Sequence, residues 1–423
     1  MPFFDFSLQL SATRAWPLSP SAFSVSSFYA IPRAIHYHIP SSCSTVTTPS
    51  SVAPMPPHQP AASTFPRMPL ELVLSFIEAA STQVDNDTYV HLLRALTLRN
   101  QRSFELFMNA VDRGTPHGIL LGDAVKRLRV VLDHNQPLGL HHHSFALAVN
   151  ACPKLSELDI SLYGCAEPGQ DIVGLPDVSR LRRAAPSFDE QTLSLLKAGP
   201  RIDHLHFDNW SENQQSIFQL LDIWPSLHFL SIGGTSPKHL QNSPPPFPCS
   251  LRGLRLNFQT TPSVDFLKWL LHNSTGSLRI LHFQRDPSVD ALEYLVNAHG
   301  SRLKSVSLPA LGSPELSNII TKCSDLIELR TENPSLSPGL YKNFPRQIEH
   351  LAFGLDRETL LNSVIDVVKT SDALKTVDVQ LRESGRAHTL LPSLKMACTY
   401  RGIELNTITD LRAFRTLDMT KPV

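Results

Sequence analysis

Two histidine-containing stretches carry the residues most able to bind metal or transfer protons. "LHHHSF" holds three adjacent histidines, His141 to His143, and "HLHFD" holds His204 and His206 at alternate positions. Metal ligands must converge on one point, whereas adjacent side chains diverge, so the triplet predicts a polar loop or a helix start. His204 and His206 would share one face of a strand, where their rings could converge.

The familiar sequence motifs of catalysis are absent from the chain. It contains no G-x-S-x-G, no Walker loop, no glycine fingerprint for a dinucleotide and no H-E-x-x-H. Scattered Ser, His and Asp residues can still meet in a folded chain, so a hydrolase-like enzyme remains an alternative. We expect a protein with no catalytic residues of its own and no cofactor.

Charge and cysteine content narrow the class of partner. Lys+Arg and Asp+Glu balance at 38 each, and the isoelectric point is near 7.3, so the chain as a whole should attract neither nucleic acid nor an anionic membrane. The six cysteines form no C-x-x-C pair, which fits a reducing compartment, cytoplasmic or nuclear. No apolar run approaches the roughly 20 residues of a membrane helix.

A pattern of apolar residues at x, x+3 and x+5 recurs along the chain and would position these side chains. It occurs in "KLSELDI", "RIDHLHF", "SLHFLSI", "SLRGLRL", "SLRILHF", "RLKSVSL", "QIEHLAF" and "ALKTVDV". "AVKRLRV" and "YRGIEL" extend the series at its two ends, "DLIELRT" keeps two of the three positions, and a degenerate "DVSRLRR" follows "KLSELDI". The central residues are spaced by roughly 22 to 27, which is the range of leucine-rich repeats.

The pattern predicts strand–helix units. Its last two apolar residues alternate along a short strand and face one side, while the first caps the preceding turn. Segments with helical periodicity lie between the strands, and Thr261-Pro262, Asp286-Pro287 and Ser313-Pro314 have the residue types that begin helices. Stacked units would form a solenoid with parallel strands inside and helices outside; an ordinary α/β domain is the alternative.

The residue between the two inward-facing apolar positions would point to the concave side of such a solenoid. These residues mix charge and imidazole, so they are either a solvated surface or a surface that recognises a target protein. The predicted target-binding residues are Asp159, Arg182, His206, Arg255, His282, Arg330, Asp378 and Glu404.

The N-terminal part of the chain has a different composition. Residues 1–64 are rich in Ser, Thr and Pro, and we expect them to be disordered. "FPRMPLELVLSFIEAAS" follows, with an i, i+4 apolar stripe, and "YVHLLRALTLRNQRSFELFMNAV" predicts one or two further helices. Helices over residues 65–115 are too short to be stable alone, so they should pack against the repeats or against a partner.

Both regions resemble known families. "ACPKLSELDI" and "KCSDLIELRT" resemble the cysteine-containing leucine-rich repeats often found behind an F-box, and "MPLELVLSFIEAA" with "LLRALTLRNQRSF" resembles the two helices of a divergent, fungal-type F-box. The resemblance implies docking on a Skp-type adaptor and, through it, on a cullin. The adaptor-binding residues it implies are Met68, Pro69, Leu72, Val73, Phe76, Ile77, Leu96, Leu98 and Phe104.

The resulting expectation is a non-catalytic adaptor of an SCF-type ubiquitin ligase that recruits an unidentified target. Its predicted parts are a leader (1–64), F-box-like helices (65–115), a leucine-rich-repeat solenoid (116–410) and a tail (411–423). A helix that merely caps the solenoid, and a leucine-rich scaffold unconnected with ubiquitin, are the alternatives.

Overall fold

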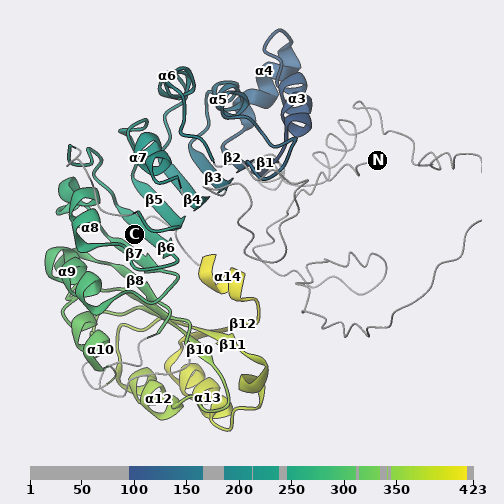
Figure 1. Ribbon diagram of the computed structural model, residues 1–423. Helices are drawn as coiled ribbons and strands as arrows, with labels where there is room; N and C mark the ends of the chain where they lie inside the picture. Colours follow the sequence, from purple (N-terminus) through teal and green to yellow (C-terminus); the bar gives the residue numbers. More distant parts are fainter. Residues whose placement is uncertain are drawn as a thin grey trace, which may run out of the picture. The chain divides into compact units, whose positions relative to one another are not determined.

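The predicted α/β fold is confirmed for the part of the chain that the computed structural model describes. This part comprises residues 95–164, 185–211, 213–237, 245–310, 314–333, 341 and 344–416. Within it, 12 parallel strands form a single sheet, and helices cover one face of that sheet in a solenoid-like arrangement (Figure 1). The predicted leader and the helix after Phe65 lie outside the described residues.

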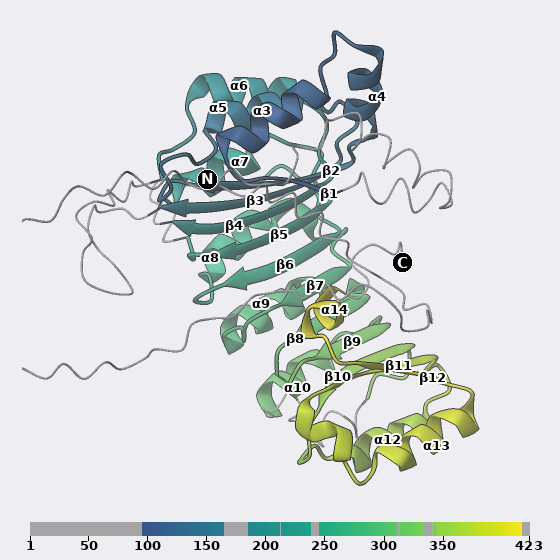
Figure 2. The same ribbon diagram turned by 90° about the vertical axis from the view of Figure 1, so that its right-hand side faces the viewer.

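The strands follow one another in the sheet in the order of the sequence, each parallel to the next (Figure 2). They are β1 (Ala95–Leu98), β2 (Arg127–Asp133), β3 (Glu157–Gly164), β4 (His204–Ser211), β5 (Phe229–Gly234), β6 (Gly253–Phe258), β7 (Ile280–Phe283), β8 (Ser305–Leu308), β9 (Glu328–Thr331), β10 (His350–Leu355), β11 (Thr376–Leu381) and β12 (Glu404–Ile408). Each strand-to-strand connection is therefore a single repeat.

Most of the connections contain a helix on the same face of the sheet. The α-helices are α3 (Gln101–Ala110), α4 (Pro116–Ala124), α5 (His142–Asn150), α6 (Glu190–Ala198), α7 (Gln215–Leu221), α8 (Val264–Leu270), α9 (Val289–His299), α10 (Pro314–Ile320), α12 (Leu361–Thr370), α13 (Leu391–Arg401) and α14 (Leu411–Thr416). Short 3-10 helices occupy His272–Ser274, Gly300–Arg302 and Glu383–Ala387. Among the described helices, none is long and apolar enough to cross a membrane.

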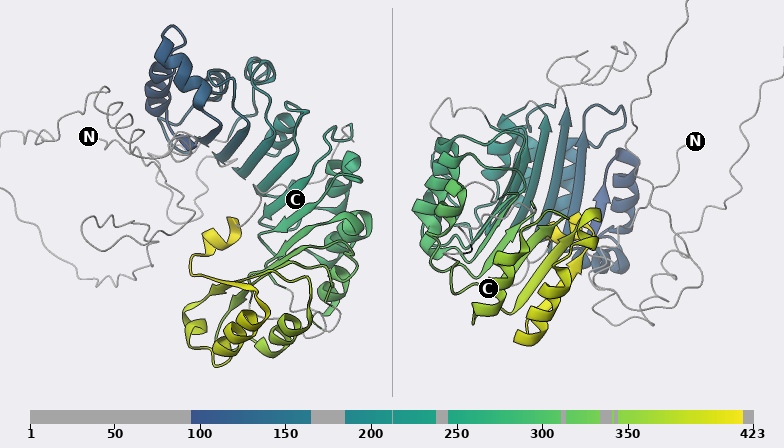
Figure 3. Two further views of the ribbon diagram at one scale, coloured as in Figure 1. Left: turned by 180° about the vertical axis from the view of Figure 1, so that it is seen from behind. Right: turned by 90° about the horizontal axis from the view of Figure 1, so that it is seen from below.

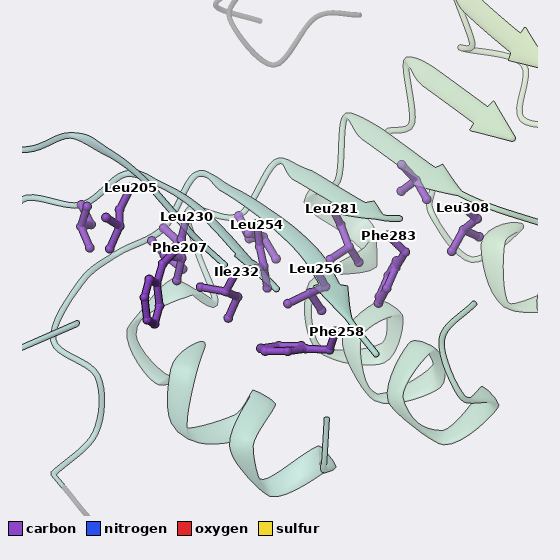
Figure 4. Packing of buried hydrophobic residues seen from close by; sticks show 14 of the residues in the cluster. Leu205, Phe207, Leu230, Ile232, Leu254, Leu256, Phe258, Leu281, Phe283 and Leu308 are labelled. Atoms are coloured by element: carbon purple, nitrogen blue, oxygen red, sulfur yellow. The ribbon is translucent and has the colours of Figure 1, made fainter. Parts of the chain in front are cut away.

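The core lies between the sheet and these helices, and two rows of side chains build it (Figure 4). Because strand side chains alternate, the x+3 and x+5 residues of every repeat face the helices, as the sequence pattern predicts. One row runs Leu96, Leu128, Leu158, Leu205, Leu230, Leu254, Leu281, Val306, Leu329, Leu351, Val377, Leu405. All but Leu96 and Leu405, on the two edge strands, are buried.

The first apolar residue of each repeat closes the turn before its strand. Leu227, Leu251 and Leu278, for example, are buried at this position. Just beyond it, two successive backbone N–H groups donate to one carbonyl of the preceding repeat, as His228 and Phe229 do to Asp203. This arrangement recurs along the sheet, and it fixes the register between neighbouring turns.

Two of the three predicted helix starts are wrong by two residues. The N-caps of α8 and α9 are Ser263 and Ser288, whose hydroxyl groups accept the N–H of Phe266 and Ala291. The prolines at 262 and 287 thus precede the caps instead of opening the helices. A serine hydroxyl close to the backbone satisfies an otherwise unpaired helical N–H, and so it decides where each helix begins.

The expected second F-box-like helix is divided between a strand and a helix. Leu96 and Leu98 lie in β1, which pairs with β2 in register, and Phe104 is buried in α3. Leu98 is fully packed on the helix face of the sheet, so the sheet begins before the boundary expected at residue 116. "LLRALTL" carries Leu93, Leu96 and Leu98 at the x, x+3, x+5 spacing, a signal of a strand that helical periodicity obscured.

The described cysteines are free thiols enclosed on the helix side of the sheet. Cys152, Cys249, Cys323 and Cys398 are all buried, and each belongs to a different repeat. Burial raises the pKa of Cys152 and of Cys323 to about 12. They pack as small apolar groups, and their pKa values keep them protonated.

Candidate functional site

The face of the sheet opposite helices α3–α13, here called the open face, carries a continuous row of residues that is polar on every strand except β10. This central row comprises Thr97, Arg129, Asp159, His206, Ser231, Arg255, His282, Ser307, Arg330, Ala352, Asp378 and Asn406. Six of the eight predicted target-binding residues belong to it. The register therefore confirms their common position, while their role in binding a target stays a prediction.

The two remaining predicted residues do not belong to the central row. Glu404 pairs with Thr376, and Asn406 is the partner of Asp378, so the expected position of Glu404 was wrong by one step along the face. The reason is that Leu405 aligns with Val377, which leaves Glu404 ahead of it. Arg182 lies outside the described residues, and β3 pairs directly with β4.

Glu328 is the centre of a buried hydrogen-bond network on β7 to β11. One carboxylate oxygen of Glu328 accepts from Ser305 at 2.7 Å, and the other accepts from Arg330 at 2.6 Å. The Ser305 hydroxyl lies 2.8 Å from Nε2 of His282. His350 lies between Glu328 and Asp378, at 3.6 and 2.8 Å. Each charged group in this network therefore has a partner of opposite charge within reach.

The two histidines of this network respond to it in opposite ways. Burial lowers the pKa of His282 well below its ordinary value, and the charges of Arg330 and Arg255 lower it further. Burial also acts to lower the pKa of His350, but the hydrogen bond to Asp378 and the charge of Glu328 outweigh it, so the net pKa is raised. The network thus favours neutral His282 and protonated His350.

Helix α14 packs on the open face, on the side of the sheet that the other helices leave uncovered (Figures 1 and 3). Arg415 forms a two-pronged ion pair with Glu332, with Nε–Oε1 at 2.7 Å and Nη2–Oε2 at 2.6 Å. Its carbonyl oxygen accepts from Arg255 at 3.1 Å and from Arg330 at 3.3 Å. Phe414 is fully buried, and the Arg330 guanidinium lies 5.8 Å from its ring centroid.

We call Arg255, Arg330 and Glu332 the α14 contact site. Glu332 lies two residues after Arg330, and its backbone carbonyl accepts from Arg382 at 3.2 Å. Burial, followed by the charges of Arg330 and Arg415, lowers the pKa of Arg255 to about 10. Three guanidinium groups thus crowd one another here, and Glu332 supplies the carboxylate that holds Arg415 among them.

The open face of β2 to β4 has exposed ion pairs in place of a buried network. Arg127 and Glu157 lie 3.8 Å apart, and Arg129 and Asp159 lie 3.6 Å apart. The arginine side chains are 51% and 43% exposed. Such pairs contribute little to stability, and the Arg127–Glu157 pair remains accessible to a partner, whereas Nε of Arg129 and Oδ1 of Asp159 are buried.

The two histidines of "HLHFD" have separate partners. His206 contacts a residue of its own strand, β4, and His204 stacks on a residue of the next strand, β5. His206 Nε2 lies 3.1 Å from Oδ2 of Asp208, and the His204 ring stacks on Phe229 at 4.4 Å between centroids. Burial lowers the pKa of His204. Across the described residues, no group of three or more His, Cys, Asp or Glu side chains could hold a metal ion.

The triplet of histidines forms the start of a helix, as its spacing predicts. His141 is the N-cap of α5, and His142 and His143 lie in its first turn. His142 is buried, stacks on Phe188 at 4.3 Å and places Nε2 3.0 Å from Nε2 of His134. Burial, with the charge of His134, lowers the pKa of His142 to about 4, so the ring is a neutral core group.

A polar hollow of about 330 Å³ lies at the turns that precede the strands. Arg279, Ser301, Arg302, Lys304 and Asp325 line it, and Lys304 lies 3.5 Å from Asp325. Arg279 and Lys304 occupy equivalent places in consecutive repeats, directly after the first apolar residue. A basic residue after the first apolar position of consecutive repeats is therefore the sequence signal for this hollow.

The repeat pattern did not predict several residues of the site, because they lie in the rows beside the central row. Glu328 and His350 precede it, Glu332 follows it, and Arg415 comes from a helix 83 positions further along the chain. Strand alternation alone could have found Glu328 and His350, since they share a face with Arg330 and Asp378. Nothing in the local pattern indicates that Arg415 reaches Glu332.

The described part of the chain is thus a parallel α/β repeat protein whose open face carries a mostly polar central row, part-exposed on β2 to β4 and covered by α14 further along. Neither a protein-family model nor a curated protein matches the sequence.

Proposed function

We propose that the protein is a non-catalytic recognition subunit of an SCF-type ubiquitin ligase. In this proposal, the F-box-like segment that begins at Phe65 binds a Skp-type adaptor and thereby a cullin, while the open face binds the target protein. Transfer of ubiquitin is performed by other subunits, and this protein contributes proximity.

The observation that carries the recognition half of the proposal is the central row. It brings charged and imidazole side chains from β3 to β11 onto one face, although these residues are far apart in the sequence. Asp159, His206 and Arg255 are partly exposed there, whereas His282, Arg330 and Asp378 are buried. Charged and hydrogen-bonding groups on a rigid sheet suit the selection of one partner over others. Support for the adaptor half comes from the resemblance of Met68, Pro69, Phe76 and Ile77 to F-box positions.

The test is co-precipitation of the full chain with a Skp-type adaptor. Docking through an apolar helix depends on burial of large side chains, so Pro69→Ala combined with Phe76→Asp should reduce recovery at least about 10-fold. Met396→Asp, on an exposed part of α13, is the matched control and should leave recovery unchanged. Failure of the unaltered chain to bind, or equal binding by the double variant, would overturn the adaptor half.

A protein-interaction scaffold unconnected with ubiquitin is the second candidate. It is favoured by the burial of Leu98 and Phe104 in the chain's own core, where neither side chain is available to an adaptor. The same co-precipitation separates the two candidates. A scaffold predicts no recovery of the Skp-type adaptor, together with partners that are lost when Arg127 and Arg129 are replaced.

A further inference from the structure

Helix α14 differs from the preceding helices in what it connects and where it lies. The earlier helices link one strand to the next and cover the core side of the sheet. Helix α14 follows the last strand, β12, and packs on the open face (Figure 2). It therefore stands where an external ligand of that face would bind, without being needed to join two repeats.

Few side chains hold α14 in place. Among its residues 411–416, Phe414 is the single buried side chain, and Arg415 forms an ion pair with Glu332, the residue that follows β9. Leu411 is 38% exposed, and Arg412, Ala413 and Thr416 are also exposed. A helix of six residues is not stable by itself, so α14 depends on these two anchors.

The α14 contact site recognises three features of the dipeptide Phe414-Arg415. Glu332 accepts both prongs of the arginine side chain, and Arg255 and Arg330 donate to the carbonyl group that follows it. The Arg330 guanidinium also faces the aromatic ring. Since a buried carboxylate requires a cation, Glu332 selects arginine at this position. None of these contacts depends on residues before Phe414.

We infer that the α14 contact site is a binding site for an aromatic–arginine segment of a partner protein, and that α14 occupies it until such a segment displaces it. The inference rests on the proposed function, because it states the chemistry of the target that the open face recognises. The bound segment presents an aromatic side chain over Arg330 and pairs its arginine with Glu332, as α14 does.

Because a short linker joins α14 to β12, α14 competes with any partner, and this competition sets the affinity that the partner needs. A segment joined by a short linker competes at an effective concentration on the order of millimolar, so a free segment that makes the same contacts displaces it only at a comparable concentration. A partner gains the required strength through further contacts. The exposed polar groups of β2 to β4, including Arg127, Arg129 and Glu157, lie on the same face and can supply them.

A labelled peptide tests this inference directly. The probe is a fluorescein-labelled peptide with the sequence of residues 410–416, DLRAFRT, and its binding to the full chain is measured by fluorescence anisotropy. A release variant, Phe414→Ala with Arg415→Ala, should bind the probe at least about 10-fold more tightly than the unaltered chain. Adding Glu332→Gln to that variant should weaken binding at least about 10-fold, and a probe reading DLRAAAT should not bind.

Equal binding by the unaltered chain and the release variant would overturn the inference, as would equal binding after Glu332→Gln. Circular dichroism of each variant checks that the sheet is intact. Hydrogen exchange of the unaltered chain needs no substitution at all: the unlabelled peptide at millimolar concentration should accelerate exchange at residues 411–416, and unchanged exchange would count against displacement. The Skp-type co-precipitation depends on residues 68–77, so failure of either experiment is distinct from failure of the other.

Discussion

The open face of β2 to β4 and the open face of β7 to β11 carry polar side chains in the same rows, but they use them differently. In the first region Arg127 forms an exposed pair with Glu157, and Arg129 forms a half-exposed pair with Asp159. In the second, Arg330 and Asp378 are buried in a continuous network around Glu328. The row position of a side chain thus decides which way it points, whereas its neighbours decide whether it stabilises the fold or remains free for a partner.

Removal of one partner from the buried network should have the largest effect. Arg330→Ala leaves Glu328 with its charge buried and should lower the free energy of unfolding by about 3–5 kcal/mol, measured by urea denaturation. Arg129→Ala, in the same row, is the matched control and should cost less than about 1 kcal/mol. Equal effects would remove the distinction between the two regions.

Truncation of Phe414 should have the next largest effect. Phe414→Ala removes the buried anchor of α14, and the expected loss is about 1–3 kcal/mol. The loss is bounded because α14 can detach without unfolding the sheet. Limited proteolysis should therefore cleave the variant within residues 409–416 while the remainder resists. Leu411→Ala, on the exposed side of α14, should leave the cleavage rate unchanged; loss of the whole domain to protease would contradict a detachable helix.

A histidine of the core, His142, and a histidine of the buried network, His350, should give opposite dependences of stability on pH. The folded pKa of His142, about 4, lies below its unfolded value, so its contribution is complete above about pH 6.5 and is lost as the pH falls toward 4. Asp189, His134 and His141 are the charged groups around it. When the pH is lowered from 7 to 5, the free energy of unfolding of a His142→Phe variant should fall by about 2 kcal/mol less than that of the unaltered chain.

His350 has a raised pKa, so its contribution is complete below about pH 6.5 and is lost as the pH rises through the higher folded value. In a His350→Gln variant, the loss of stability on raising the pH from 6 to 8 should be smaller than in the unaltered chain, as measured by urea denaturation at each pH. Identical slopes for both proteins would mean that the pair with Asp378 does not couple to folding.

The exposed pairs of β2 and β3 should have the smallest effect. Arg127→Ala combined with Arg129→Ala should change the free energy of unfolding by about 1 kcal/mol or less, and 0.5 M salt should reduce that difference further because exposed charges are screened. Thermal denaturation at two salt concentrations measures this. A loss above about 2 kcal/mol would show that this region, too, depends on its ion pairs.

The sequence was sufficient to predict the sheet because each repeat buries the same positions. Leu205, Leu230 and Leu254 must face the helices, and that requirement fixes where His206 and Arg255 point. The prediction from this pattern failed at the two edge strands, β1 and β12. The residues of β1 also matched a helix, and β12 offers Thr407 where most repeats have an apolar residue, so the position of Glu404 was placed one step off.

The burial of the central row could not be predicted from the sequence. Whether Arg330 is exposed depends on Phe414 and Arg415, which approach it from 84 and 85 positions away. Local pattern carries no information about such a contact, because α14 has only one buried side chain and no repeat position. The adaptor-binding role of Met68, Pro69, Leu72, Val73, Phe76 and Ile77 lies outside the described residues and stays a prediction.

The four buried cysteines of the described residues are natural probes of local unfolding. They sit in separate repeats, and each is a protonated thiol that reacts with an alkylating reagent only when its own repeat opens. Because a solenoid is held together by contacts between neighbouring repeats, its ends can open before its middle. Pulse alkylation followed by peptide mass mapping would thus give the order in which Cys152, Cys249, Cys323 and Cys398 lose protection, and with it the direction in which the sheet unravels.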